Sequence, residues 1–213
     1  MNTQLNDEKQ AAQQEMRSIM NRSARIITLS GWAGIWTGLC ALAGAAIAWK
    51  WIHEPRYQYL GQVNHASTDY FDAATMHFIY LGLAVFIASL AGVLFFTHRK
   101  AKRNNLHLWN YASQQMVLQL FFPILAGGVF PIMFIYYGCG MFVVPACLTF
   151  YGLALISASR LTLSDIRYLG MLEVMLGCTG LFFPGLGLYF AAIGFGVLHI
   201  LYGGMMWNKY DNG

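Results

Sequence analysis

Charged residues are scarce in this sequence. Only 10% of its 213 residues are Asp, Glu, Lys or Arg, whereas a soluble domain carries about 25%. Hydrophobic residues make up 57% of the chain, and its mean hydropathy is +0.48. This composition excludes a disordered chain, a basic nucleic-acid-binding domain and an ordinary water-soluble enzyme. It predicts an integral membrane protein that contacts the lipid bilayer and binds no nucleic acid.

Cysteine is sparse as well, and recognised catalytic motifs are missing. The four cysteines, at positions 40, 139, 147 and 178, show no CxxC spacing, which argues against a disulfide framework or a zinc site. The sequence contains no HExxH, GxSxG or P-loop pattern. We therefore expect neither an enzyme nor a protein with a cofactor. The first 25 residues are polar and mixed in charge, so no cleavable signal peptide is expected.

Long apolar runs, by contrast, fill most of the chain. A transmembrane helix needs about 20 predominantly apolar residues. The runs are continuous and do not alternate, which favours helices over the strands of a β-barrel. Six spans are predicted, at residues 26–49, 74–96, 113–137, 141–158, 166–183 and 186–207. The sequence thus predicts an all-α, polytopic membrane domain over 26–207, between a polar or amphipathic tail (1–25) and a short tail (208–213).

The positive charges are unevenly distributed along the chain. Of the 13 Lys and Arg, 11 lie before the first span, after the second, around the loop between the fourth and fifth, or at the C-terminus. The positive-inside rule then places both termini in the cytoplasm of a cell (inner) membrane. The densest group consists of Arg99, Lys100, Lys102 and Arg103, here called the basic cluster. Binding of anionic lipid is a secondary role that such a cluster suits.

Small residues mark one face of the first span. Gly34 and Gly38 are separated by three residues, a spacing that lets two helix backbones approach closely. Packing within the chain is the simpler interpretation. A seam between two copies of the chain is the alternative, and it predicts a homo-oligomer.

The loop between the first two spans holds a candidate pair for metal binding. His65 and Asp69 are four residues apart, so on a helix they would share a face. Imidazole and carboxylate groups bind metals. A polar loop contains such residues in any case, which leaves an ordinary solvated loop as the alternative.

One acidic residue and one histidine lie deep inside predicted spans. Glu173 is eight residues past Asp165, and His199 is eight residues before Trp207, so each lies about 12 Å from the cytoplasmic end of its helix. A short turn joins the fifth and sixth spans, which makes them antiparallel neighbours. Glu173 and His199 are therefore expected at similar depth and are candidate partners.

Helical spacing favours an inward orientation for this pair. Glu173 shares a face with Gly170 and Gly177, and small residues mark helix–helix contacts in membranes. Other polar residues at similar depth would line the same intramembrane site: Tyr151, Tyr202 and Gln119. Such a site suits a proton relay or the binding of a cation. An interhelical hydrogen bond that only locks the hairpin is the alternative.

Three stretches of the C-terminal half, FYGLALISAS, LTLSDIRYLG and FGVLHILYG, resemble an uncharacterised family of small bacterial six-span inner-membrane proteins. The resemblance implies a membrane class and implies no activity. The leading hypothesis for function is therefore a small transporter or proton/ion relay that uses Glu173 and His199. The alternative is an accessory or regulatory membrane protein whose cytoplasmic segments contact a protein partner. A membrane enzyme is the least favoured of the three.

Overall fold

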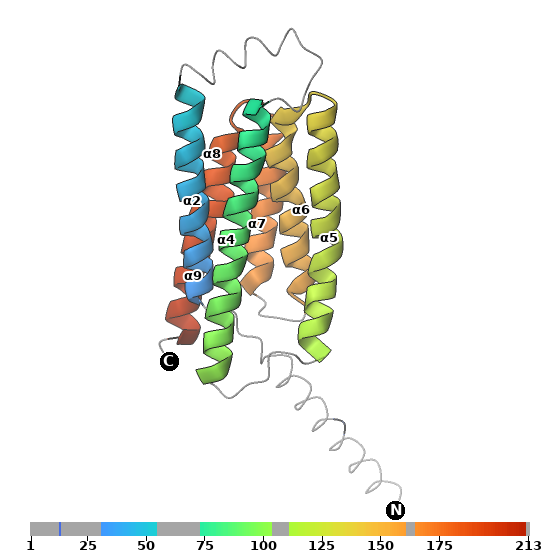
Figure 1. Cartoon of the computed structure of the whole chain (residues 1–213). Coiled ribbons are helices and arrows are strands. Elements are labelled where there is room, and N and C mark those ends of the chain that lie inside the picture. Colours follow the sequence, from blue (N-terminus) through green and yellow to red (C-terminus); the bar gives the residue numbers. More distant parts are fainter. Residues whose placement is uncertain (1–12, 14–30, 55–72, 104–110, 161–164, 212–213) are drawn as a thin grey trace, which may run out of the picture.

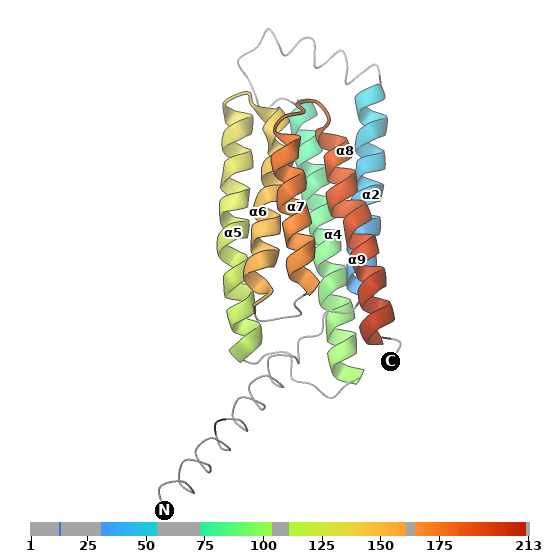
Figure 2. The same cartoon turned by 180° about the vertical axis from the view of Figure 1, so that it is seen from behind.

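The computed structural model describes residues 13, 31–54, 73–103, 111–160 and 165–211. Over these ranges the chain forms helices joined by turns, which confirms the all-α prediction. The long helices lie side by side along one axis (Figures 1 and 2). The first five are α2 (Gly31–His53), α4 (Ala73–Arg103), α5 (Tyr111–Tyr136), α6 (Val143–Ala158) and α7 (Asp165–Gly180), and a 3₁₀ turn, η1 (Gly140–Phe142), precedes α6.

The last helical stretch of the bundle is continuous, but its helix type changes along its length. It comprises α8 (Gly187–Ala191), η2 (Ala192–Leu198), α9 (His199–Met206) and η3 (Trp207–Asp211). Both η2 and η3 are π-helical. A π-helix is rare and usually occurs as a short interruption of an α-helix. The interruption at η2 ends at the residue before His199, one of the two buried residues of interest.

In the described part of the chain, five helices are long and apolar enough to cross a bilayer, so the chain is a multi-pass membrane protein by helix length and hydropathy. They are Gly31–His53, Thr75–Arg103, Ser113–Tyr136, Gly140–Ala158 and Gly187–Lys209. Their outer surfaces carry large exposed apolar side chains such as Phe86, Leu94 and Phe122. This pattern is expected where a helix faces lipid.

Helix α7 differs from the predicted span at 166–183. It has 16 residues and is about 24 Å long, shorter than a hydrocarbon core of about 30 Å. The helix ends at Gly180, and residues 181–183 form turns whose N–H groups donate to carbonyls three residues earlier. Pro184 follows, and it disfavours helical geometry in Phe183. Gly185 then turns the chain with a φ of +95°, a value that suits glycine.

The helices pack in a definite order. Helix α2 contacts α4, α9 and η2, while α6 contacts α5 and α7. Helices α4 and α5 thus lie at the outside of the bundle, each against one main neighbour. Trp36 on α2 covers Gly92 on α4 and donates a hydrogen bond from Nε1 to the Ala88 carbonyl oxygen at 3.1 Å. The interior between α2, α6, α7 and α9 is where polar side chains can meet.

The glycine face of α2 packs within the chain. A Cβ added to Gly34 would lie 2.9 Å from the Cα of Gly203, and one added to Gly38 would lie 2.6 Å from the Gly196 carbonyl oxygen. Helix α9 and segment η2 therefore cover this face. The predicted homo-oligomer seam through Gly34 and Gly38 is wrong, because the face is already occupied inside the monomer.

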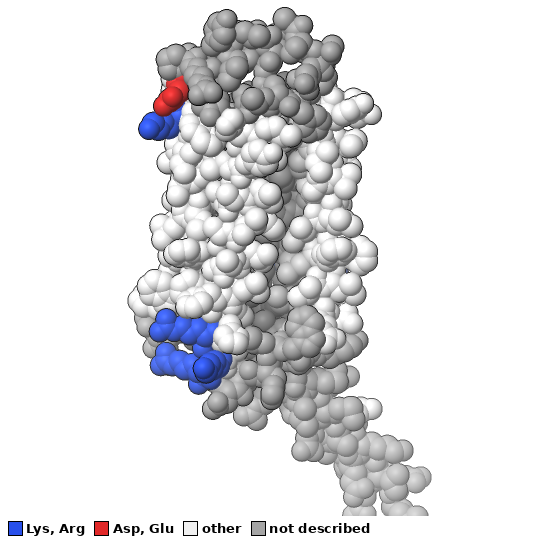
Figure 3. Space-filling view, viewed as in Figure 1, with Lys and Arg blue, Asp and Glu red and all other residues white. Residues whose placement is uncertain are grey.

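The basic cluster lies at one end of the bundle, which we call the basic end. Helix α4 extends to Arg103, beyond the predicted limit at residue 96, and carries the cluster in its last five residues. Figure 3 shows these Lys and Arg side chains together below a surface with little other charge. The same end holds an ion pair between Lys209 and Asp165, at 2.8 Å. Lys50 and Glu54 are exposed at the opposite end, where α2 finishes.

Candidate functional site

Glu173 is completely buried in the bundle. Its exposed fraction is 0%, and it lies on the inner face of α7 with Gly170 and Gly177, both also buried. This confirms the face predicted from helical spacing. Neither carboxylate oxygen makes a hydrogen bond within the described part of the chain. An acidic side chain in this position is exceptional, because ionisable groups inside a membrane are costly and rare.

His199 lies beside Glu173, as predicted. Its exposed fraction is 4%, and its Nδ1 atom is 3.4 Å from Oε1 of Glu173. The two residues come from neighbouring antiparallel helices, α7 and α9, which place them at the same depth. The predicted pair is therefore present in the structure.

Tyr151 completes a chain of three ionisable groups. Its hydroxyl group on α6 lies 2.7 Å from Nε2 of His199, on the opposite edge of the ring from Glu173. The rings of Tyr151 and His199 have their centroids 5.4 Å apart, and Phe195 packs against both of them. The order Tyr151–His199–Glu173 thus runs from α6 through α9 to α7.

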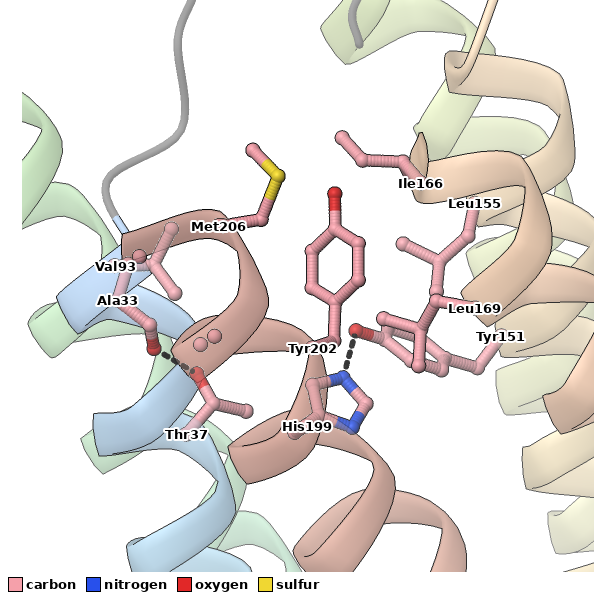
Figure 4. Close-up of a pocket in the computed structure, with 13 residues that line it drawn as sticks. Ala33, Thr37, Val93, Tyr151, Leu155, Ile166, Leu169, His199, Tyr202 and Met206 are labelled. Atoms are coloured by element: carbon pink, nitrogen blue, oxygen red, sulfur yellow. Dashed lines mark hydrogen bonds between the residues drawn. The ribbon is translucent and has the colours of Figure 1, made fainter. Parts of the chain in front are cut away.

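A small cavity borders this chain. It has a volume of about 60 Å³, enough for a few water molecules. Its lining comes from α2, α4, α6, α7 and α9 and includes the side chains of Tyr151, His199, Tyr202 and Thr37. Figure 4 shows the Tyr202 hydroxyl directed toward the gap between Met206 and Ile166. Because Ile166 lies in the first turn of α7 and Met206 ends α9, the cavity lies on the side of the basic end.

The remaining predicted site residues have different outcomes. Gln119 lies on α5, outside the set that lines the cavity. Its Oε1 atom is buried and has no hydrogen-bond partner within the described residues. His65 and Asp69 lie outside the described residues, so their predicted metal binding stays a prediction. Among the described residues, no group of three or more His, Cys, Asp or Glu is close enough together to hold a metal ion.

Sequence reasoning missed one residue of the site, Gly194. It belongs to η2, and its carbonyl oxygen lies 3.1 Å from Nδ1 of His199. A Cβ at this position would lie 2.6 Å from Oε2 of Glu173. The only signal in the sequence is the position of this glycine five residues before a buried histidine. The chain has 22 glycines, so this position alone does not single out Gly194.

Chemically, the arrangement is suited to passing a proton between its groups. Tyrosine and histidine each both donate and accept hydrogen bonds, and a carboxylate accepts them. Histidine can take a proton at one ring nitrogen and release one from the other, which suits a relay. The cavity borders Tyr151 and His199, and Glu173 lies at the other end of the group.

Comparison of the chain with models of protein families, with curated proteins and with solved structures finds no match. The resemblance to a bacterial inner-membrane family therefore stays a prediction. The function has to be argued from the geometry of Tyr151, His199 and Glu173.

Proposed function

We propose that the protein is a small transport protein that relays protons within its membrane through Tyr151, His199 and Glu173. One observation carries the proposal: a fully buried carboxylate lies 3.4 Å from a buried imidazole, whose other nitrogen is hydrogen-bonded to a tyrosine beside a cavity. Ionisable residues inside a membrane are retained mainly where function requires them.

The lack of hydrogen bonds at Glu173 supports a proton relay over a purely structural contact between helices. A buried polar group that serves packing is normally hydrogen-bonded, and an unsatisfied one costs about 1–3 kcal/mol. Oε1 of Glu173 lies 3.4 Å from Nδ1 of His199, but Glu173 makes no hydrogen bond among the described residues. A carboxyl group held in this loose way can gain or lose a proton without breaking a hydrogen-bond network.

The charges support one orientation of the protein in the membrane. The basic end carries the basic cluster, and the positive-inside rule assigns such ends to the cytoplasm. The cavity lies on that side, so protons would enter from the cytoplasmic half. They would pass from cavity water to Tyr151 and His199 and then protonate Glu173. The proposal includes a location in the inner membrane of a bacterium, with both termini cytoplasmic.

The proposal is tested by proton flux in liposomes that contain the purified protein. A pH-sensitive dye inside the vesicles reports the flux after a pH jump, with valinomycin and potassium present to cancel the membrane potential. The wild-type protein is expected to carry flux above that of empty liposomes. If it carries none, the proposal fails, and Tyr151, His199 and Glu173 serve only to hold their helices together.

Substituting Tyr151 tests the entry of the path. A Tyr151→Phe variant loses the hydroxyl that joins the cavity to Nε2 of His199 but keeps the packed ring. We expect flux to fall several-fold without being abolished, because cavity water can still reach the imidazole. Tyr168→Phe is the matched control, since Tyr168 on α7 is 67% exposed. Equal flux in the two variants would remove Tyr151 from the path.

A further inference from the structure

The turn that precedes His199 is unusual. Residues Ala192–Leu198 form a π-helix, in which backbone N–H groups bond to the carbonyl five residues earlier and the turn is wider than in an α-helix. Short π-segments inside α-helices occur frequently at functional sites. This one lies between α8 and α9 and contains Gly194, whose carbonyl oxygen and Cα both face the buried pair.

The Gly194 carbonyl group determines the protonation pattern of the His199 ring. The backbone N–H of His199 donates to the Gly196 oxygen, whereas the ring Nδ1 lies 3.1 Å from the Gly194 oxygen. A carbonyl oxygen can only accept a hydrogen bond, so Nδ1 must carry the hydrogen. In the neutral ring Nε2 is then the acceptor, and the Tyr151 hydroxyl donates to it.

The absence of a side chain at Gly194 makes room for the carboxylate. A Cβ there would lie 2.6 Å from Oε2 of Glu173 and 2.5 Å from Cδ2 of Leu148, distances that require one of these groups to move. Leu148 is fully buried and cannot move into open space. A larger residue at position 194 would therefore push against the ends of the Glu173 and Leu148 side chains and shift the carboxylate.

We propose that Gly194 is the positioning residue of this site: its carbonyl group holds His199 as the Nδ1–H tautomer, and its bare Cα lets Glu173 approach that same nitrogen. The effect on transport rests on the proposed function, whereas the assignment of the tautomer does not. The Nδ1–H group lies between two acceptors, the Gly194 oxygen at 3.1 Å and Glu173 Oε1 at 3.4 Å. A small rotation of the ring transfers the hydrogen bond from the backbone to the carboxylate.

The tautomer is measured directly by nitrogen NMR of ¹⁵N-histidine-labelled protein in lipid. The chain has six histidines, and the His199 signals are identified by their loss in a His199→Gln variant. In the wild-type protein we expect the neutral ring to show a protonated Nδ1 and an unprotonated Nε2. An Nε2–H tautomer would overturn the assignment, whatever the flux assay gives.

The space at position 194 is tested with a Gly194→Ala variant. We expect flux to fall at least tenfold and the His199 spectrum to change, because Glu173 is pushed aside. Gly204→Ala is the matched control: it lies in α9, nothing is within 4 Å of the added Cβ, and both readouts should stay at wild-type values. A Gly194→Ala protein with wild-type flux and spectrum would overturn the proposal.

A double variant separates lost positioning from lost folding. In Gly194→Ala/Glu173→Asp the shorter acid withdraws from the new methyl group, so flux is expected to recover to the level of Glu173→Asp alone. If the alanine harms only the folding of η2, the shorter acid rescues nothing, and Gly194 is then not a positioning residue. If wild-type flux is itself absent, the proposed function fails while the tautomer result still stands or falls on its own spectrum.

Discussion

A Glu173→Gln variant is expected to lose its proton flux completely while remaining folded. Glutamine has the size and shape of glutamic acid, so it fits the space beside His199 and Gly194. Its amide cannot take up and release a proton as a carboxyl group does, which interrupts the path at its innermost group. Flux should fall to the level of empty liposomes, a drop of more than tenfold.

The free energy of unfolding of Glu173→Gln distinguishes a proton relay from a purely structural role of Glu173. Removing a buried ionisable group relieves its desolvation, so we expect the free energy of unfolding to stay unchanged or rise by about 1–3 kcal/mol. Thermal unfolding in detergent provides the measurement. Glu54→Gln is the control, because Glu54 is exposed at the far end of the bundle. Retained flux in Glu173→Gln would refute the relay. A large loss of stability would instead identify Glu173 as a structural group.

A Gly152→Ala variant is expected to weaken the contact between α6 and α7. An added Cβ would lie 2.6 Å from the Gly170 carbonyl oxygen and 2.8 Å from the Val174 backbone nitrogen, and backbone atoms cannot rotate away. Overpacking of this kind costs about 1–3 kcal/mol. Because Tyr151 is next to Gly152 and Glu173 follows Gly170 by three residues, the shift should also reduce flux.

Thermal unfolding and flux measured on one preparation test this expectation. Gly128→Ala is the matched control, since nothing lies within 4 Å of a Cβ added there on α5. We expect the control to melt at or above the wild-type temperature, because alanine favours a helix over glycine. If both variants melt at the same temperature, the backbone contact between α6 and α7 is not what holds these helices together.

The buried pair could be predicted because its geometry depends on local rules. Counting residues from each helix end gives the depth of Glu173 and His199, and the short turn at 181–186 makes their helices antiparallel neighbours. The three- and four-residue spacing of small residues then identifies the inner face of α7. Each step uses helix geometry alone, which holds in any all-helical membrane protein.

Other features depend on tertiary contacts that the sequence does not encode simply. Gln119 has a suitable depth, but α5 packs mainly on α6 and lies outside the cavity. The spacing of Gly34 and Gly38 predicts a close helix contact without saying whether the partner helix belongs to the same chain. The π-segment before His199 leaves no trace in hydropathy, because it changes the pitch of a helix and not its composition.

The shortness of α7 has a consequence for how the protein is made. A nascent segment enters the bilayer from the translocon according to its length and apolarity, and a carboxylate near its centre opposes entry by about 3 kcal/mol. Helix α7 has 16 residues, including Asp165, Arg167 and Glu173, and is a poor insertion signal by itself. The close backbone contact between Gly152 and Gly170 gives it a partner that precedes it in synthesis. We therefore expect α6 and α7 to insert together as a hairpin, with Glu173 sheltered from lipid from the outset.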